Sequence, residues 1–401
     1  MTAISDSPAR GGTVTALRAL LPTLAAIFAI DAMTALVIIG YGNTYLINHL
    51  SAPSSYPAYA LAIYGLVKLV SAPAGGWVLD RFPARTIAGA ACGLELAGFA
   101  VILATHSARG YLGGVGLLAS GIALAWLLVF HAVGEASDPA GRGPATAFMG
   151  LTSVGATATG FGIAALIGES RYWQAAFTLG IGLAIVSSLS LLRLHPRERQ
   201  VIEVRAQPQA PPTVAERRAL RRFAFAVVLV HFAVITATLG AFGPFALRTL
   251  DLSLLQAGLL IAPAMLAGAG AMYLAGHRSR HGRRLTELGV LYLVGAAALV
   301  WIAAIHHPVF LALAAVPFAI SLAGVHPLMN ASLLDAAQAG DRAGTALGWL
   351  FFAEGLGSVL GPLAIGTIIE LAGVRVGLLG LSGAVFALGA GAVAANRLVK
   401  L

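Results

Sequence analysis

Six ionisable side chains stand inside long apolar stretches of the sequence, where a charge is difficult to keep. A charge at the centre of a lipid bilayer costs roughly 2.5–3.5 kcal/mol, so each such group needs a partner, water or a bound proton. Together these residue types offer proton exchange, ion pairing and hydrogen bonding to a polar solute. The six are Asp31, Lys68, Glu95, His231, His326 and Glu354.

Asp31 is the first candidate for proton exchange, because it lies near the middle of the first apolar stretch. It shares a helical face with Thr34 and Ile38, a partly polar stripe suited to a water-filled cavity. Low-dielectric surroundings favour a neutral carboxyl group, which can then trade a proton near neutral pH. The alternative is a structural carboxylate held by a neighbouring helix.

The histidines are the next candidates. His231 occupies, in the second half of the chain, the position equivalent to Asp31. The two are expected to face one cavity and to bridge when it is closed; the alternative is a histidine that serves helix packing. His326 precedes Asn330 by one turn, with Pro327 bending the helix between them. This pair either hydrogen-bonds a bound molecule or packs.

Glu354 and Lys68 have open pairings. Glu354 is followed by Gly355 and Gly357, which permit close helix contact, so it is either a second proton site or a lock between the two halves. Lys68 either neutralises Asp31 or Glu95 or attracts an anionic solute. Pairing with Lys68 is the expected use of Glu95, although the sequence does not choose among these pairings.

The elements that carry these groups are membrane helices. The chain is 58% hydrophobic and 10% charged, with a mean hydropathy of +0.86, whereas soluble domains have about 25% charged residues. Apolar windows of ~20 residues, long enough to span a bilayer, recur twelve times. The predicted spans are 19–41, 58–79, 85–105, 110–133, 144–168, 173–194, 222–247, 254–275, 285–305, 309–333, 343–369 and 373–396.

The net charge of +9 does not indicate nucleic-acid binding, because the basic residues lie in the short links between spans. With both termini inside, all but five of the 25 Lys and Arg residues lie within or next to inside segments, as the positive-inside rule expects. The five are Lys68, within a span, and Arg109, Arg171, Arg248 and Arg375, on the outside. The first span is too long for a signal-peptide core, and the single cysteine, Cys92, forms no intrachain disulfide.

The only long polar link, around residues 196–220, carries mixed charge and proline, which is typical of a flexible or partly helical tether. It separates an N-terminal six-helix bundle, residues 1–195, from a C-terminal one, residues 221–401. The halves resemble copies offset by about two hundred residues, as in transporters built from repeats. The matching positions are Gly40 with Gly240, Gly76 with Gly276, Glu135 with Asp335, and Gly155 with Gly355.

The short charged hairpin between the second and third spans carries a family signature. Gly76, Asp80, Arg81 and Arg85 match the pattern G-x-x-x-D-R/K-x-G-R/K-R/K, with Pro83 in place of its glycine and Ala84 in place of a basic residue. The chain thereby resembles the major facilitator superfamily. This implies an all-α membrane protein of twelve transmembrane helices in two pseudo-symmetric six-helix bundles around one cavity.

The resemblance also implies roles for the hairpin. Gly76 allows a close helix approach, and Asp80 can cap the positive end of a nearby helix. In the family an acidic residue at the end of the fourth span joins this hairpin, so Glu135 with Asp80 and Arg81 is the predicted inside latch, with Arg85 holding that side. An acidic residue in the first span, here Asp31, resembles several proton-coupled exporters.

The family's antiporter signature is only partly present. The fifth span contains Gly150, Gly155, Gly160 and Gly162, but Phe161 replaces the proline of the expected Gly-Pro step. That step occurs instead at Gly361-Pro362 in the eleventh span, the repeat partner of the fifth.

The sequence holds no recognisable catalytic, nucleotide-binding or metal-binding motif, so we predict no enzyme activity, cofactor or metal. The predicted function is secondary active transport of a small organic solute by alternating access, with proton-coupled efflux first. The alternatives are proton-coupled uptake of an organic anion and a non-transporting receptor or sensor. We predict a monomer in the cell membrane, whose partners are the solute, protons and lipid.

Overall fold

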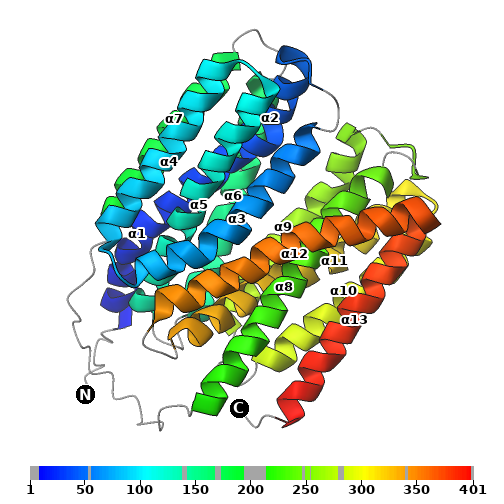
Figure 1. The fold of residues 1–401 in the computed structure, drawn as a ribbon. Coiled ribbons are helices and arrows are strands. Elements are labelled where there is room, and N and C mark those ends of the chain that lie inside the picture. Colours follow the sequence, from blue (N-terminus) through cyan, green and yellow to red (C-terminus); the bar gives the residue numbers. More distant parts are fainter. Residues whose placement is uncertain are drawn as a thin grey trace, which may run out of the picture.

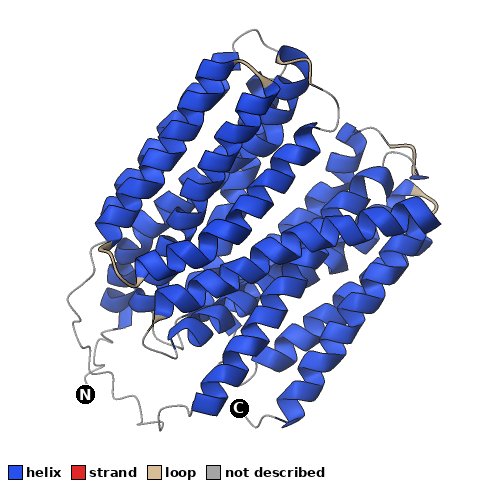
Figure 2. Cartoon of the chain, in the orientation of Figure 1, coloured by secondary structure: helices blue, strands red, loops and turns tan. Residues whose placement is uncertain are grey.

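The computed structural model describes residues 9–52, 56–137, 142–167, 173–193, 214–245, 249–252, 254–278, 284–338 and 342–398. These residues form helices joined by short loops, with no strand among them (Figure 2). The helices of the first half are α1 (Ala9–Met33), α2 (Tyr41–Thr44), α3 (Tyr56–Leu79), α4 (Ala84–Thr105), α5 (Ala108–Ala136), α6 (Arg142–Ile167) and α7 (Trp173–Leu192). Those of the second half are α8 (Val214–Pro244), α9 (Leu254–Arg278), α10 (Arg284–Ala304), α11 (Pro308–Gln338), α12 (Ala343–Ala372) and α13 (Val374–Leu398).

The twelve predicted spans coincide with the twelve long helices, which confirms the all-α membrane fold. In the described residues, eleven of these helices are long and apolar enough to cross a membrane. The predicted link 196–220 lies mostly outside the described residues, and its last residues form the first turns of α8. The middle of the second-half hairpin, residues 279–283, also lies outside them.

The first span differs from the single regular helix that the sequence predicts. Three residues after Asp31, just past the end of α1, the chain continues as a π-helical segment, Thr34–Gly40. Such a turn frees backbone carbonyl groups, and the hydroxyl of Tyr111 on α5 donates to the carbonyl oxygen of Val37 at 2.8 Å. The hydropathy pattern carries no signal for this π-helical segment, because π-helical and α-helical turns bury the same residue types.

The helices form two bundles, one from each half of the chain (Figure 1). Within the first, α1 packs on α6 and α7, while α5 packs on α3 and α4. Within the second, α8 packs on α12, α9 on α11, and α10 on α13. The bundles meet where α3 lies along α12 and where α6 lies against α9 and α11. We call the end of the molecule at which α3 ends and α6 and α12 begin the Asp80 end.

Two repeat-related glycines permit close approaches between the bundles. A Cβ at Gly76 would clash with the carbonyl oxygen of Gly344 and lie 2.9 Å from Cα of Gly348 on α12. A Cβ at Gly276 would clash with Ala147 and lie 2.7 Å from the carbonyl oxygen of Gly143 on α6. The predicted close contact at Gly76 is therefore confirmed, and the repeat reproduces it on the other side of the interface.

Candidate functional site

An ion pair joins the two bundles between α3 and α12. The Lys68 ammonium donates to the Glu354 carboxylate, and the exposed fractions of the two side chains are only 10% and 13%. α3 brings Lys68 to this position because its glycine-lined contact with α12 fixes how the two helices face each other. Of the roles predicted for Glu354, this geometry is that of a lock across the interface.

Asp31 lies beside this pair. Ser153 of α6 is within hydrogen-bonding reach of the Asp31 carboxyl group, and the charges of Lys68 and Glu354 both act on it. The Oδ2 atom of Asp31 is buried and has no hydrogen-bond partner among the described residues. Four helices, α1, α3, α6 and α12, thus bring two carboxyl groups, one ammonium and one hydroxyl together. We call Asp31, Lys68, Ser153 and Glu354, with the rings of Tyr64 and Phe351, the interface cluster.

Two aromatic rings complete the surroundings of the Lys68 ammonium. Its nitrogen lies 5.7 Å from the ring centroid of Tyr64, one turn earlier on α3, and 5.8 Å from that of Phe351 on α12. Both distances are within the range in which a cation is attracted by the face of an aromatic ring. Two rings and the Glu354 carboxylate therefore contact one positive charge, and the Asp31 carboxyl group is close enough to feel it.

Glu95 does not take the predicted role. Its side chain on α4 is buried against α5, with its Cγ 2.6 Å from the position that a Cβ at Gly121 would occupy. Both of its carboxyl oxygens are buried without a hydrogen-bond partner among the described residues. The expected pairing of Glu95 with Lys68 is therefore wrong, because Lys68 faces the other bundle while Glu95 faces its own.

The predicted histidines gather within the second bundle. His231 on α8 is fully buried, and its Nδ1 lies 3.2 Å from the hydroxyl of Tyr292 on α10. The ring centroids of His231 and His326 are 6.2 Å apart, and Asn330 is buried on α11. The described contacts of His231 are thus within its own bundle, which is the geometry of the packing alternative and not of a bridge to Asp31.

At the Asp80 end, the signature aspartate caps a helix of the opposite bundle. The Asp80 carboxylate accepts hydrogen bonds from the backbone N–H groups of Gly344 and Thr345, both at 2.8 Å, and from the Thr345 hydroxyl. These donors are in the first turn of α12, where unpaired N–H groups and the helix dipole favour an anion. The predicted capping of a nearby helix by Asp80 is confirmed.

The other residues of the predicted latch have different surroundings. Arg81 stacks on Trp77, with its guanidinium carbon 3.9 Å from the ring centroid, and Arg85 is exposed in the first turn of α4. A carboxyl oxygen of Glu135 lies 3.3 Å from Nε2 of His131, one turn earlier on α5. At this hairpin the Asp80 cap ties the two bundles together, and the latch of Asp80, Arg81 and Glu135 stays a prediction.

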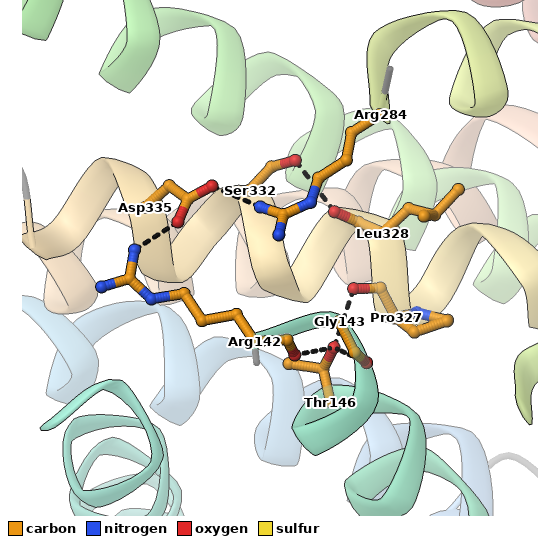
Figure 3. Close-up of polar contacts among 8 residues, drawn as sticks. All are labelled: Arg142, Gly143, Thr146, Arg284, Pro327, Leu328, Ser332 and Asp335. Atoms are coloured by element: carbon orange, nitrogen blue, oxygen red, sulfur yellow. Dashed lines mark hydrogen bonds and ion pairs between the residues drawn. The ribbon is translucent and has the colours of Figure 1, made fainter. Parts of the chain in front are cut away.

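A second polar tie between the bundles was not predicted as a site. Asp335 on α11 accepts from Arg142 on α6 with one carboxylate oxygen and from Arg284 on α10 with the other (Figure 3). All three side chains are nearly buried. One turn into α6, the Thr146 hydroxyl also lies 2.9 Å from the carbonyl oxygen of Pro327, another contact between the bundles.

The sequence held one signal for this triad: Asp335 is the repeat partner of Glu135, each seven residues before an arginine. It did not reveal that Asp335 pairs with the arginine of the other half. Tyr64, Ser153 and Phe351 carried no signal of their own. Among the described residues, no group of three or more His, Cys, Asp or Glu side chains is arranged to hold a metal.

Comparison with known proteins agrees with this architecture. The sequence profile described as Major Facilitator Superfamily matches residues 23–362. A similar solved structure is the crystal structure of the human organic anion transporter MFSD10 (TETRAN), with a TM-score of 0.76 and 16% sequence identity over 92% of this chain and 97% of that one. At this identity the likeness concerns the fold alone. No curated protein sequence matches the chain.

Proposed function

The chain belongs to the Major Facilitator Superfamily and is a membrane transporter rather than an enzyme, and on that premise we propose that it exports a small organic solute in exchange for protons. It does so by alternating access, opening the space between its two bundles to one side of the membrane at a time. A proton moving down ~100 mV supplies ~2.3 kcal/mol, enough for roughly fifty-fold accumulation on one side.

The observation that carries the proposal is the Lys68–Glu354 ion pair with Asp31 beside it. The pair joins the bundles, so it must break or rearrange when they move apart. Asp31 belongs to the same bundle as Lys68, whereas Glu354 belongs to the other. Asp31 and Glu354 can therefore compete for one ammonium, and the outcome decides whether the bundles are tied together.

Protonation sets that competition. With a proton on Asp31, one ammonium and one carboxylate remain, and the Lys68–Glu354 pair is balanced. When Asp31 loses its proton, two carboxylates attract Lys68 and the tie to Glu354 weakens. Opposite charges in low dielectric interact strongly, so one proton is sufficient to change the stability of the tie.

Besides the Lys68–Glu354 pair, two further ties between the bundles lie toward one end of the molecule. The Asp80 cap and the Arg142–Asp335–Arg284 triad both hold the bundles together at the Asp80 end. We assign this end to the cytoplasm because it carries most of the basic residues. Both termini then lie on the cytoplasmic side of the cell membrane. The proposed cycle opens these ties when the solute enters from the cytoplasm. The two-bundle division at residues 196–220 and a monomeric state belong to the same proposal.

One alternative is the uptake of an organic anion, the class of solute for which the similar human transporter MFSD10 is named. Lys68 would then supply the positive charge, but Glu354 neutralises it in the conformation described here. A receptor or sensor on the same scaffold would bind its ligand without moving it.

Purified protein in liposomes separates these functions. We expect solute flux to require an opposing proton gradient, and Asp31→Asn to abolish proton-driven flux while leaving solute exchange in both directions. Asp251→Asn, an exposed loop aspartate, is the matched control and should behave like the unmodified chain. Proton-driven flux that persists in Asp31→Asn contradicts the proposal, and ligand binding without flux in the unmodified chain supports the sensor instead.

A further inference from the structure

We infer that the transported solute is an organic cation carrying an ammonium group, and that Lys68 occupies the place of that group in the conformation described here. The inference rests on the proposed transport function and names its substrate class. It starts from the composition of the interface cluster, in which a single ammonium nitrogen contacts two aromatic rings and the Glu354 carboxylate, with a second carboxyl group, that of Asp31, near it.

Each component suits an alkylammonium ion. The faces of Tyr64 and Phe351 attract a cation at 5.7 and 5.8 Å, and aromatic rings on several sides are how proteins hold ammonium ligands. Glu354 provides a charge-assisted hydrogen bond, the strong kind that an N–H donor forms with a carboxylate. Lys68 itself demonstrates that a butyl chain ending in an ammonium group fits between α3 and α12.

A solute ammonium can also displace the Lys68 ammonium, because Lys68 belongs to only one of the two bundles that form the site. Its side chain is long and flexible, and Asp31 on the same bundle offers it a second partner. A solute ammonium that binds Glu354 leaves Lys68 to pair with Asp31. The solute then takes over the contact between bundles that the lysine made.

Charge balance links this replacement to the proton. The cluster has two carboxyl groups and one lysine, so with both carboxyls ionised it is one positive charge short. Either a proton on Asp31 or the ammonium group of a solute supplies that charge. The described groups that face Asp31 are Lys68, Tyr64, Ser153 and Glu354, and the lysine is the only cation among them. Cation binding therefore expels the Asp31 proton to water, which is one-for-one exchange.

The test uses three probes of nearly equal size and shape on the purified full chain in lipid nanodiscs: 2-phenylethylamine, 2-phenylethanol and phenylacetate. In weakly buffered solution we expect the amine to bind most tightly and to release about one proton per chain, as linkage between binding and protonation requires. Asp31→Asn should bind the amine more weakly, because the displaced Lys68 then has no second carboxylate to pair with, and should release no proton. Equal binding of the alcohol, tighter binding of the carboxylate, or amine binding without proton release overturns the inference.

Substitution of the tethered lysine gives a second, independent readout. Lys68→Met keeps the length of the side chain and removes its charge, so we expect roughly tenfold tighter amine binding, as expected for ~1.4 kcal/mol of relieved competition. Lys68→Arg leaves a competing cation in place and should show no such gain. Loss of amine binding in Lys68→Met contradicts the inference and favours an anionic solute. Proton-driven flux of another solute, with no preference for the amine, would overturn this inference while the proposed function stands.

Discussion

The two contacts between the bundles have the same backbone plan and different chemistry. On one side, α3 approaches α12 at Gly76, and on the other, α9 approaches α6 at the repeat-related Gly276. Along α3 and α12 the contact continues to an exchangeable ion pair, Lys68–Glu354. Along α6 and α9 it continues instead to Gly150, packed against the uncharged side chain of Met272.

This difference gives the two contacts different roles: one holds the bundles together, and the other changes with protonation. Repeat symmetry preserves the close helix packing, which depends only on the absence of a side chain, and leaves the polar groups free to diverge. The α6 side is held at its end by the Asp335 triad, where one carboxylate lies between two arginines. The α3 side carries Asp31 next to its ion pair and is therefore the side on which a proton changes the outcome.

The largest expected effect is on the α6 side of the interface, which the Asp335 triad holds together. Asp335→Ala removes the carboxylate shared by Arg142 and Arg284 and leaves buried positive charge, which costs about 3–5 kcal/mol when one partner of a buried ion pair is lost. We expect a clear drop in the melting temperature of the purified protein. Ser332→Ala, one turn away on the same helix, is the control and should change it little. An unchanged melting temperature in Asp335→Ala would show that the triad does not hold the bundles.

The glycine contacts test whether the two sides share one packing plan. Gly76→Ala and Gly276→Ala each place a Cβ where backbone or Ala147 already lies, and overpacking of this kind costs about 1–3 kcal/mol. We expect both variants to unfold at lower temperature. Gly89→Ala and Gly93→Ala on α4 are matched controls, since nothing lies within 4 Å of the added atom. If only Gly76→Ala unfolded at a lower temperature, the two helix contacts would not share one packing arrangement.

The smallest expected effect concerns the Asp80 cap. Asp80→Ala leaves the first N–H groups of α12 without their acceptor, at a cost of about 1 kcal/mol, or roughly fivefold faster local opening. Hydrogen exchange at Gly344 and Thr345 is the measurement, with the first turn of α10 as the internal reference. Asp80→Asn keeps a hydrogen-bond acceptor, so its exchange rate at Gly344 and Thr345 should lie between those of the unmodified chain and Asp80→Ala. Unchanged exchange would mean that the cap contributes nothing to this end.

Much of the architecture could be read from residues whose meaning is local. Long apolar windows predicted every long helix, because a bilayer requires about twenty apolar residues per span. Gly76 predicted a close helix contact, and Asp80 a helix cap, because each property belongs to the residue itself. The π-helical segment after α1 was not predictable from local pattern, and one of its carbonyl groups, that of Val37, accepts a hydrogen bond from Tyr111 of another helix.

The sequence by itself thus determined the twelve spans, the repeat between halves, and which few residues carry charge where lipid or close packing surrounds them. The tertiary structure decided their partners: Lys68 pairs with Glu354, 286 residues away, and not with Glu95, while Arg142 pairs with Asp335, 193 residues away. The physical reason is that hydropathy and helix length act within one segment. An ion pair depends instead on which helices are neighbours and how each is rotated about its axis.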